Sequence, residues 1–155
     1  MSEIRPQHIV AACTLVTREN GDVLMVTTHS RRGWEVPGGV VEIGESPIEG
    51  ALRETLEESG ITAHITQMAG IYTNITHGIV IFAFLGDYIS GELTPSSETP
   101  EVAWVSRDKV LSLIEEPPML ARVGDMLSFN GQIIYRTYAK KPYQDVSVVE
   151  LGIRC

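Results

Sequence analysis

Residues 39–61 read GVVEIGESPIEGALRETLEESGI, a run rich in glycine and glutamate. Its central part predicts a helix with defined ends. Ser46 can cap the helix, and Pro47 fits the first helical position, where its missing N–H would have no partner. Glu49 at the third position completes a capping box with Ser46. Gly60 can adopt the left-handed conformation that ends a helix.

The predicted helix has one packing face and one charged face, since successive residues are about 100° apart around the axis. The packing face is expected to hold Ile48, Ala51, Leu52, Thr55 and Leu56. Glu54, Glu57 and Glu58 share an arc on the other side. Such an arc is often only a solvated surface, but three close carboxylates repel one another and favour a bound cation.

Arg53 lies one turn before Glu57 and can hold a carboxylate with its planar fork. One arginine does not neutralise three carboxylates. A hard divalent cation would do so, because Mg²⁺ prefers oxygen ligands and is often held by few carboxylates together with substrate phosphate. The turn Pro37-Gly38-Gly39 precedes this segment. Its glycines allow a backbone carbonyl to approach a metal or phosphate closely.

With these residues in place, the segment resembles the Nudix box, G-x5-E-x7-R-E-U-x-E-E-x-G-U, where U is a bulky aliphatic residue. Every fixed letter is present between Gly39 and Ile61. The one departure is Thr55 at the first U position, where its hydroxyl can bond a carbonyl one turn earlier. The chain is therefore identified as a member of the Nudix (MutT-like) hydrolase family.

The resemblance implies an α/β Nudix fold, in which a mixed β-sheet is sandwiched between α-helices. Residues 1–155 are long enough for a single domain with a sizeable core. Alternating β-branched and helical patterns along the chain agree with a layered α/β arrangement. We therefore expect one Nudix hydrolase domain over residues 1–155, with the box at 39–61.

The implied reaction is metal-dependent hydrolysis of a pyrophosphate linkage in a nucleoside diphosphate joined to another group. Mg²⁺ or Mn²⁺ is the implied cofactor. By the same resemblance, Glu57 and Glu58 are the principal metal ligands and Gly38 offers its backbone carbonyl. Glu54 is either a metal ligand or the base that activates water. Arg53 is grouped with these three glutamates as catalytic.

Further residues of the box resemble supports. Arg53 and Glu45 would orient the carboxylates, and Gly39 begins the box. Some relatives add a glutamate from a later loop, and here either Glu98 or Glu101 could be that residue. The alternative for both is a solvated loop carboxylate.

Composition limits the classes of molecule that the protein is expected to bind. A net charge of −8 argues against a nucleic-acid polymer, whose binding relies on clustered lysine and arginine. Apolar runs are too short to span a bilayer, and the start of the chain lacks a signal-peptide core, so we expect a cytoplasmic protein without a membrane partner. The expected partner is a small phosphorylated nucleotide. The sequence leaves the oligomeric state open, a homodimer included.

Outside the box, the patterns predict strands at 9–17, 23–28, 61–75, 79–85, 101–105 and 132–138. A helix capped by Ser106 is expected to run to Glu116 and to end at Pro117-Pro118. A second helix is expected over 119–129, and a polar tail after the last strand. Core packing is the expected role of Cys13, while Trp34 and Tyr72 are either core residues or stacking surfaces for a base.

The sequence leaves the substrate open. The stretch Ile75-Thr76-His77-Gly78-Ile79 lacks the proline or tyrosine that marks some ADP-ribose and dinucleoside-polyphosphate hydrolases of the family. A nucleoside triphosphate or modified nucleotide is the leading interpretation. One alternative is a Nudix-fold domain that binds a nucleotide without turnover. Another is isoprenoid diphosphate isomerisation, for which Cys13 and Cys155 are poorly placed thiols.

Overall fold

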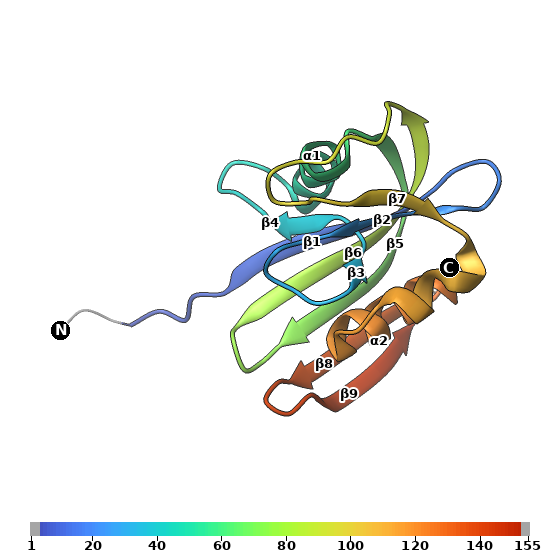
Figure 1. The fold of residues 1–155 in the computed structure, drawn as a ribbon. Helices are drawn as coiled ribbons and strands as arrows, with labels where there is room; N and C mark the ends of the chain where they lie inside the picture. The colour runs from blue at the N-terminus through green and yellow to red at the C-terminus, as the bar shows by residue number, and fades with distance from the viewer. Residues whose placement is uncertain (1–3, 153–155) are drawn as a thin grey trace.

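The computed structural model of the protein describes residues 4–152 (Figure 1). The two strands predicted first form a hairpin of β1 (Ile9–Thr17) and β2 (Val23–Thr27). In the turn between them, Gly21 has a φ of 91°, in the left-handed region that glycine tolerates. The Asn20 side chain accepts a hydrogen bond from the Asp22 N–H at 3.0 Å. The turn at Asn20-Gly21-Asp22 therefore closes this hairpin.

The remaining elements alternate between strands and helices. In chain order they are β3 (Trp34–Glu35), β4 (Gly38–Val40), α1 (Pro47–Ser59), β5 (Thr62–Asn74), β6 (Ile79–Ser90), β7 (Val102–Val105), the 3₁₀ helix η1 (Arg107–Leu113), α2 (Pro117–Leu127), β8 (Ile133–Ala139) and β9 (Gln144–Leu151).

All strands belong to one mixed sheet with the order β3-β2-β1-β6-β5-β8-β9, while β4 pairs with β1 and β7 pairs with β2. The β1–β6 and β5–β8 pairs are parallel, and the other pairs are antiparallel. The β1–β6 register runs from Ile9 opposite Ile79 to Thr17 opposite Asp87. Central β6 is continuously apolar at its start, as expected for a strand covered on both faces.

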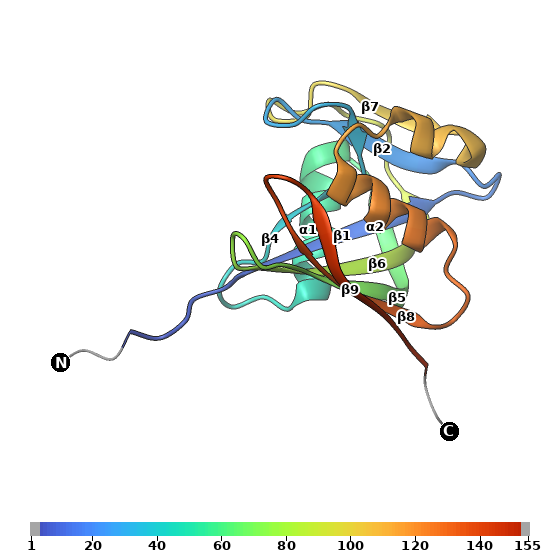
Figure 2. The same cartoon turned by 90° about the horizontal axis from the view of Figure 1, so that it is seen from below.

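Helices cover both faces of the central strands, as Figures 1 and 2 show from two directions. Successive side chains of a strand point to opposite faces, and β1 illustrates the consequence. Ala12 packs in the same cluster as Ala51 of α1. Cys13 and Leu15 instead pack in the large core cluster that holds Val123 of α2. The predicted mixed sheet sandwiched between helices is confirmed.

Two expectations about the segment before β8 are wrong. Ser106 makes no side-chain capping bond, and the element after it is a 3₁₀ helix rather than an α-helix. Pro117 and Pro118 do not end a helix but begin α2. Proline is well tolerated in the first turn, where its missing N–H needs no partner and its fixed φ suits the helix.

The expected polar tail is also wrong, because residues 144–151 form strand β9, which pairs with β8. The register runs from Ile133 opposite Leu151 to Ala139 opposite Gln144. Every residue of β9 is exposed. An edge strand of this kind lacks the buried, one-sided apolar pattern from which strands are recognised, although Val146 and Val148 fit strand propensity.

Two smaller points concern cysteine and the membrane. Cys13 is buried in the core, as expected, whereas Cys155 lies outside the described residues. Within residues 4–152, no helix has the length and apolar character needed to cross a bilayer.

Candidate active site

Helix α1 carries most of the predicted site residues, and its ends form as predicted. The Ser46 hydroxyl accepts a bond from the Glu49 N–H at 3.2 Å, and the Glu49 carboxylate accepts one from the Ser46 N–H at 2.9 Å. Gly60 has a φ of 79° and donates its N–H to the Leu56 carbonyl at 2.9 Å. The capping box and the glycine stop therefore fix where the carboxylates of α1 lie.

The packing face of α1 differs from the predicted one. Ala51 and Thr55 are buried as expected, and the Thr55 hydroxyl donates to the Ala51 carbonyl at 2.8 Å, one turn earlier. Ile48 and Leu56 are instead exposed. Glu58 is turned inward, so the buried side of the helix reaches into the arc that was expected to gather charge.

Arg53 is the centre of an ion-pair network. Its guanidinium donates to both oxygens of Glu45 at 2.7 and 3.1 Å. The same group donates to Glu54 at 3.1 Å and to Glu57 at 3.2 Å. It also bonds the Val40 carbonyl at 3.1 Å, which ties the helix to the loop before it. Chiefly because of the hydrogen bonds from Arg53, the pKa of Glu45 is lowered to about 2.

Glu58 is a nearly buried carboxylate, with 7% of its surface exposed. The Gly38 N–H donates to its Oε1 at 2.8 Å, which joins α1 to the turn at Pro37-Gly38-Gly39. Burial raises the pKa of Glu58 to about 8, and the neighbouring carboxylates of Glu54 and Glu35 add to the rise. A charged group buried in this way is stabilised by a nearby cation.

Glu54 lies directly against the backbone of Gly39. A Cβ added to Gly39 would come within 2.6 Å of the Glu54 carboxylate. A side chain at this position would therefore displace Glu54, which gives a physical reason for glycine there. Burial raises the pKa of Glu54 as well, against the opposing effect of Arg53.

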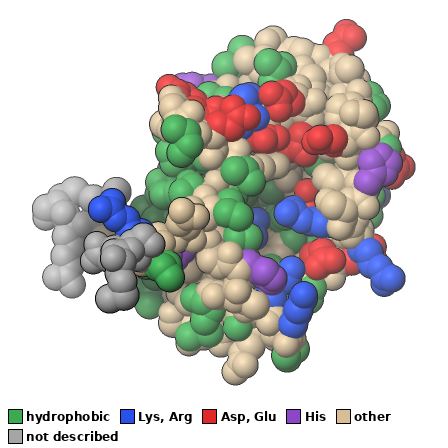
Figure 3. Space-filling model, turned by 90° about the vertical axis from the view of Figure 1, so that its left-hand side faces the viewer, with side chains coloured by type: hydrophobic (Ala, Val, Ile, Leu, Met, Phe, Trp, Pro, Cys, Tyr) green, Lys and Arg blue, Asp and Glu red, His purple; other side chains and the backbone are tan. Residues whose placement is uncertain are grey.

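One cavity of about 440 Å³ collects part of the predicted site. Glu54, Glu58, Gly38 and Gly39 line it, and so does Glu98 from the loop before β7. Figure 3 shows acidic side chains gathered across one part of this face of the molecule, beside a hollow that has basic side chains within it. The structure thus brings together residues that lie up to sixty positions apart in the sequence.

Four predicted residues lie outside the wall of this cavity, and Arg53 is one of them. Glu57 has a side chain that is 58% exposed and is held by Arg53. Glu45 is on the far side of the same arginine. Of the two loop carboxylates, Glu98 lines the cavity, whereas Glu101 lines a separate hollow together with Trp34 and Thr27.

The sequence analysis missed the opposite wall of the cavity. This wall is formed by Thr28, His29, Ser30, Arg31 and Glu35. Arg31 donates to both oxygens of the nearly buried Glu35, at 3.1 and 3.3 Å. The pair Arg31-Arg32 just before the glycine turn was visible in the sequence, but nothing local indicated that Arg31 would face the acidic helix. Tyr72, considered as a stacking surface, is completely buried and belongs to the core.

The donor set in the cavity fits a hard divalent cation. Among residues 4–152, no group of three or more acidic, histidine or cysteine side chains is arranged so that it could hold a metal ion. Mg²⁺, however, usually keeps several waters and binds one or two carboxylates together with substrate phosphates. The nearly buried carboxylate of Glu58 and the partly buried one of Glu54, beside a glycine turn, match that requirement.

Comparison with known proteins agrees with this geometry. A family model of the NUDIX domain matches residues 7–125. A MutT-like protein of Streptomyces ambofaciens is 37% identical over 111 residues, which cover 72% of this chain and 72% of that protein. A protein of Bacillus subtilis (strain 168), named "Putative 8-oxo-dGTP diphosphatase", is 31% identical over 115 residues, 74% of this chain and 76% of that protein.

The fold is shared with solved structures. The crystal structure of a Mutator MutT protein from Bacillus halodurans superposes with a TM-score of 0.76 and 26% identity, and covers 92% of this chain and 97% of that one. All nine strands and both α-helices of the present chain lie within the described residues 4–152.

Proposed function

This chain belongs to the Nudix family and is a hydrolase that acts on phosphoanhydride bonds, and we propose that its substrate is a nucleoside triphosphate or a modified nucleotide. One observation carries the proposal. The cavity that holds Glu54, Glu58 and Arg31 adjoins a second cavity of about 270 Å³, and the two share Arg31, Glu35, Gly38 and Gly39. A polar site for phosphates next to a largely apolar site suits a nucleotide.

The names of relatives support this substrate class. The Bacillus subtilis relative is named for 8-oxo-dGTP, a modified nucleoside triphosphate. A small nucleotide is also consistent with the net charge of −8, which disfavours a nucleic-acid polymer. We therefore propose a small-molecule substrate and no polymer partner.

We propose Mg²⁺ or Mn²⁺ as the cofactor, held by Glu54, Glu57 and Glu58 with the Gly38 carbonyl. When bound, such an ion screens the charge of the pyrophosphate and lowers the pKa of coordinated water. Glu58 is fixed for this role by the Gly38 N–H at 2.8 Å. Glu57 is exposed, and it shares the guanidinium of Arg53 with Glu54.

The other residues bind the substrate and move a proton. Arg31, across the cavity from α1, is placed to bind phosphate oxygens with its guanidinium. Of the three candidate bases predicted from the sequence, Glu54 and Glu98 line the cavity and Glu101 does not, so we propose that Glu54 or Glu98 takes the proton from the attacking water. Burial raises the pKa of Glu54, which makes its carboxylate a better proton acceptor than an ordinary glutamate.

We also propose that residues 1–155 act as one Nudix domain. The family model ends at residue 125, within α2. Strands β8 and β9 follow that point, yet β8 pairs with β5 in the same sheet as β1 and β6. Tyr138 of β8 also lines the second cavity. The segment after residue 125 therefore contributes to the core and to the proposed site.

A substrate screen tests the proposal. Nucleoside triphosphates, oxidised nucleotides, nucleotide sugars, ADP-ribose and dinucleoside polyphosphates are incubated with the protein in Mg²⁺ or Mn²⁺, and the products are identified by mass spectrometry. We expect release of a nucleoside monophosphate and pyrophosphate from a triphosphate, abolished by a chelator and restored by added metal. Saturable nucleotide binding with no turnover of any compound would favour the non-catalytic binding domain instead.

A further inference from the structure

The second cavity contains a buried cation that the proposed chemistry does not use. Its walls are mainly apolar side chains of β1, β6 and the start of α2. Its polar lining beyond the residues shared with the acidic cavity comes from Asn74, His77, Glu116, Arg122, Tyr138 and Lys140. Of these, Arg122 is the one charged side chain that is nearly buried, with 7% of its surface exposed.

Arg122 lacks the partner that a buried guanidinium normally has. Its Nε is buried and has no hydrogen-bond acceptor. Among residues 4–152, no carboxylate oxygen lies within 4.0 Å of its nitrogens. The guanidinium lies over the Tyr72 ring, 5.5 Å from its centroid. A ring face stabilises a cation less than an anion or a pair of acceptors does.

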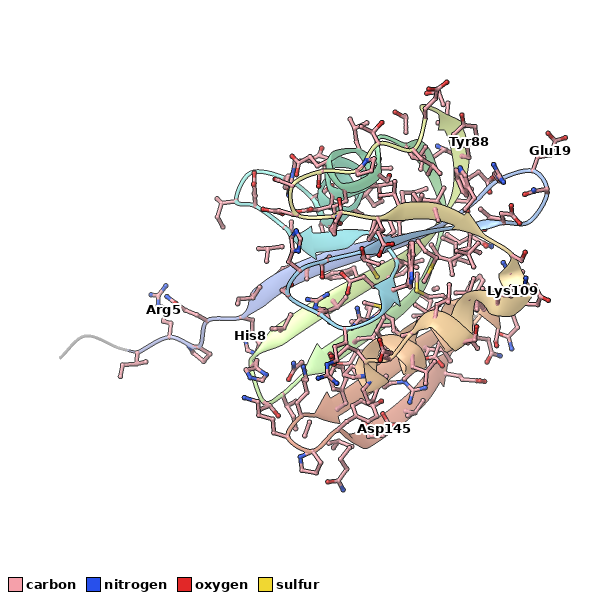
Figure 4. All side chains as sticks on the ribbon, in the orientation of Figure 1. Arg5, His8, Glu19, Tyr88, Lys109 and Asp145 are labelled. Atoms are coloured by element: carbon pink, nitrogen blue, oxygen red, sulfur yellow. The ribbon has the colours of Figure 1, made fainter. Side chains whose placement is uncertain are left out.

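The carboxylates on neighbouring parts of the chain that could pair with Arg122 are already engaged. Asp125, one turn further along α2, accepts bonds from the Tyr72 hydroxyl at 2.9 Å and from Arg136 at 2.9 Å. The same arginine donates to Asp145 of β9, which Figure 4 labels at the β8–β9 edge of the sheet. Glu35 is paired with Arg31 at 3.1 Å. Burial raises the pKa of the Cys13 thiol, which therefore stays neutral beside the guanidinium.

A buried charge without a partner is strongly unfavourable, so this arrangement favours a ligand that supplies acceptors. A guanidinium presents a rigid pair of donors and no acceptor. It matches two adjacent acceptors on one edge of a base, which guanine offers at O6 and N7. Adenine offers N7 next to an amino group, whose hydrogens would face the donors of Arg122.

We propose that Arg122 is a specificity-determining residue that binds O6 and N7 of a guanine base in the second cavity, and so selects guanine over adenine nucleotides. This inference rests on the proposed function, because the acidic cavity next door must hold the phosphates of the same molecule. The size and the apolar walls of the second cavity suit a flat base, and Arg122 supplies the directional contact.

The direct test compares kcat/KM for four triphosphates. We expect GTP to be preferred over ATP by at least about tenfold, the discrimination typical of a bidentate arginine–guanine contact. ITP keeps O6 and N7 and should match GTP. In 7-deaza-GTP the N7 acceptor is replaced by carbon, and this compound should fall toward ATP. Equal values for GTP and ATP in the wild-type protein would overturn the proposal.

Two variants test whether Arg122 causes the preference for GTP over ATP. Arg122→Met should bring the GTP to ATP ratio close to one, mainly by lowering kcat/KM for GTP. Arg107→Met is the matched control, because Arg107 lies outside both cavities and bonds only the Leu127 carbonyl. It should leave the ratio unchanged. An unchanged ratio in Arg122→Met would assign the preference, if there is one, to other residues and refute the role of Arg122.

Thermal unfolding separates this role from a structural one. Because Arg122→Met removes an unpaired buried charge, its melting temperature should equal or exceed that of the wild type. Binding of GMP and AMP, measured by calorimetry in chelator, needs no turnover. If no nucleotide is hydrolysed but GMP binds the wild type at least tenfold better than Arg122→Met, the proposed hydrolysis fails and the role of Arg122 stands. If triphosphates are hydrolysed but GTP and ATP react equally well, the proposed hydrolysis stands and the role of Arg122 is refuted.

Discussion

Arg53 and Arg122 are both on helices that cover the same sheet, but their surroundings are opposite. Arg53 on α1 donates to Glu45, Glu54 and Glu57, and each of these contacts is 3.2 Å or shorter. Arg122 on α2 is more deeply buried, yet no carboxylate of the described chain lies within 4.0 Å of it. The two cavities that these helices border share one wall, formed by Arg31, Glu35, Gly38 and Gly39.

This difference corresponds to two separate roles in the proposed function. The guanidinium of Arg53 is already paired with carboxylates, and in the proposed function this network orients them for a cation and a pyrophosphate. Around Arg122 the pairing is left to the ligand. We interpret the first region as the place where the bond is broken and the second as the place where the base is chosen. The predictions below test this contrast, beginning with the largest expected effect.

Removing a carboxylate from the acidic cavity should have the largest effect. We expect Glu54→Gln and Glu58→Gln each to lower kcat by at least about 10²–10³-fold, the loss typical of one group that stabilises developing charge. Steady-state rates with saturating Mg²⁺ measure it. Glu42→Gln is the matched control, because Glu42 lies at a variable position of the box and its side chain is 70% exposed. Rates within about twofold of wild type for Glu54→Gln and Glu58→Gln would contradict the site.

A methyl group at Gly39 should displace Glu54. Because the added Cβ would lie 2.6 Å from that carboxylate, Gly39→Ala should lower kcat by about 10- to 100-fold while the fold is kept. Gly124→Ala is the control, since a Cβ there meets nothing within 4 Å and an alanine favours the helix. Circular dichroism and kcat are measured for both. Full activity in Gly39→Ala would show that catalysis does not require the Glu54 carboxylate to lie against residue 39.

The two arginines should respond in opposite directions to the same substitution. Arg53→Met leaves Glu45 and Glu54 without their cation and should lower the free energy of unfolding. Arg122→Met should not lower it. Urea denaturation in chelator measures both variants. An equal loss in the two would mean that Arg122 has a stabilising partner and would remove the contrast between the regions.

The smallest expected effect is on the stability of the fold at low pH. The pKa of Glu45 is lowered in the folded state, from 4.5 to about 2, by its bonds with Arg53. Its stabilising contribution is therefore complete above about pH 4.5 and is lost as the pH falls toward 2. Glu45→Gln should flatten the decline of the melting temperature between pH 4.5 and 2.5. Identical declines in Glu45→Gln and wild type would show that this pair does not contribute.

The box helix could be predicted from the sequence because the interactions that define it are local. Ser46 and Glu49 are three residues apart, and the glycine stop needs only its own backbone. The Arg53–Glu57 contact follows from helical spacing. The same reasoning misplaced Ile48 and Leu56, because which side of an amphipathic helix is buried depends on the sheet beneath it and not on the helix alone.

The rest of the site depends on contacts between distant segments, which no local pattern reports. Gly38 meets Glu58 twenty positions later, and Glu98 joins the cavity from the loop before β7. Arg122 lies within the helix expected over 119–129, and nothing in the sequence singled it out. Its position next to Cys13 and Tyr72 follows from the order of strands in the sheet. Strand β9 was missed for a related reason, since an exposed edge strand has no buried face to mark it.

The most direct test of the central claim is a Mn²⁺ titration followed by electron paramagnetic resonance in three proteins. We predict saturable binding in the wild type and in Glu42→Gln, and an affinity lower by at least about tenfold in Glu58→Gln, because that carboxylate is a proposed ligand in the cavity. The same affinity in all three proteins would contradict a metal site formed by Glu58, and with it the proposed location of the hydrolytic centre.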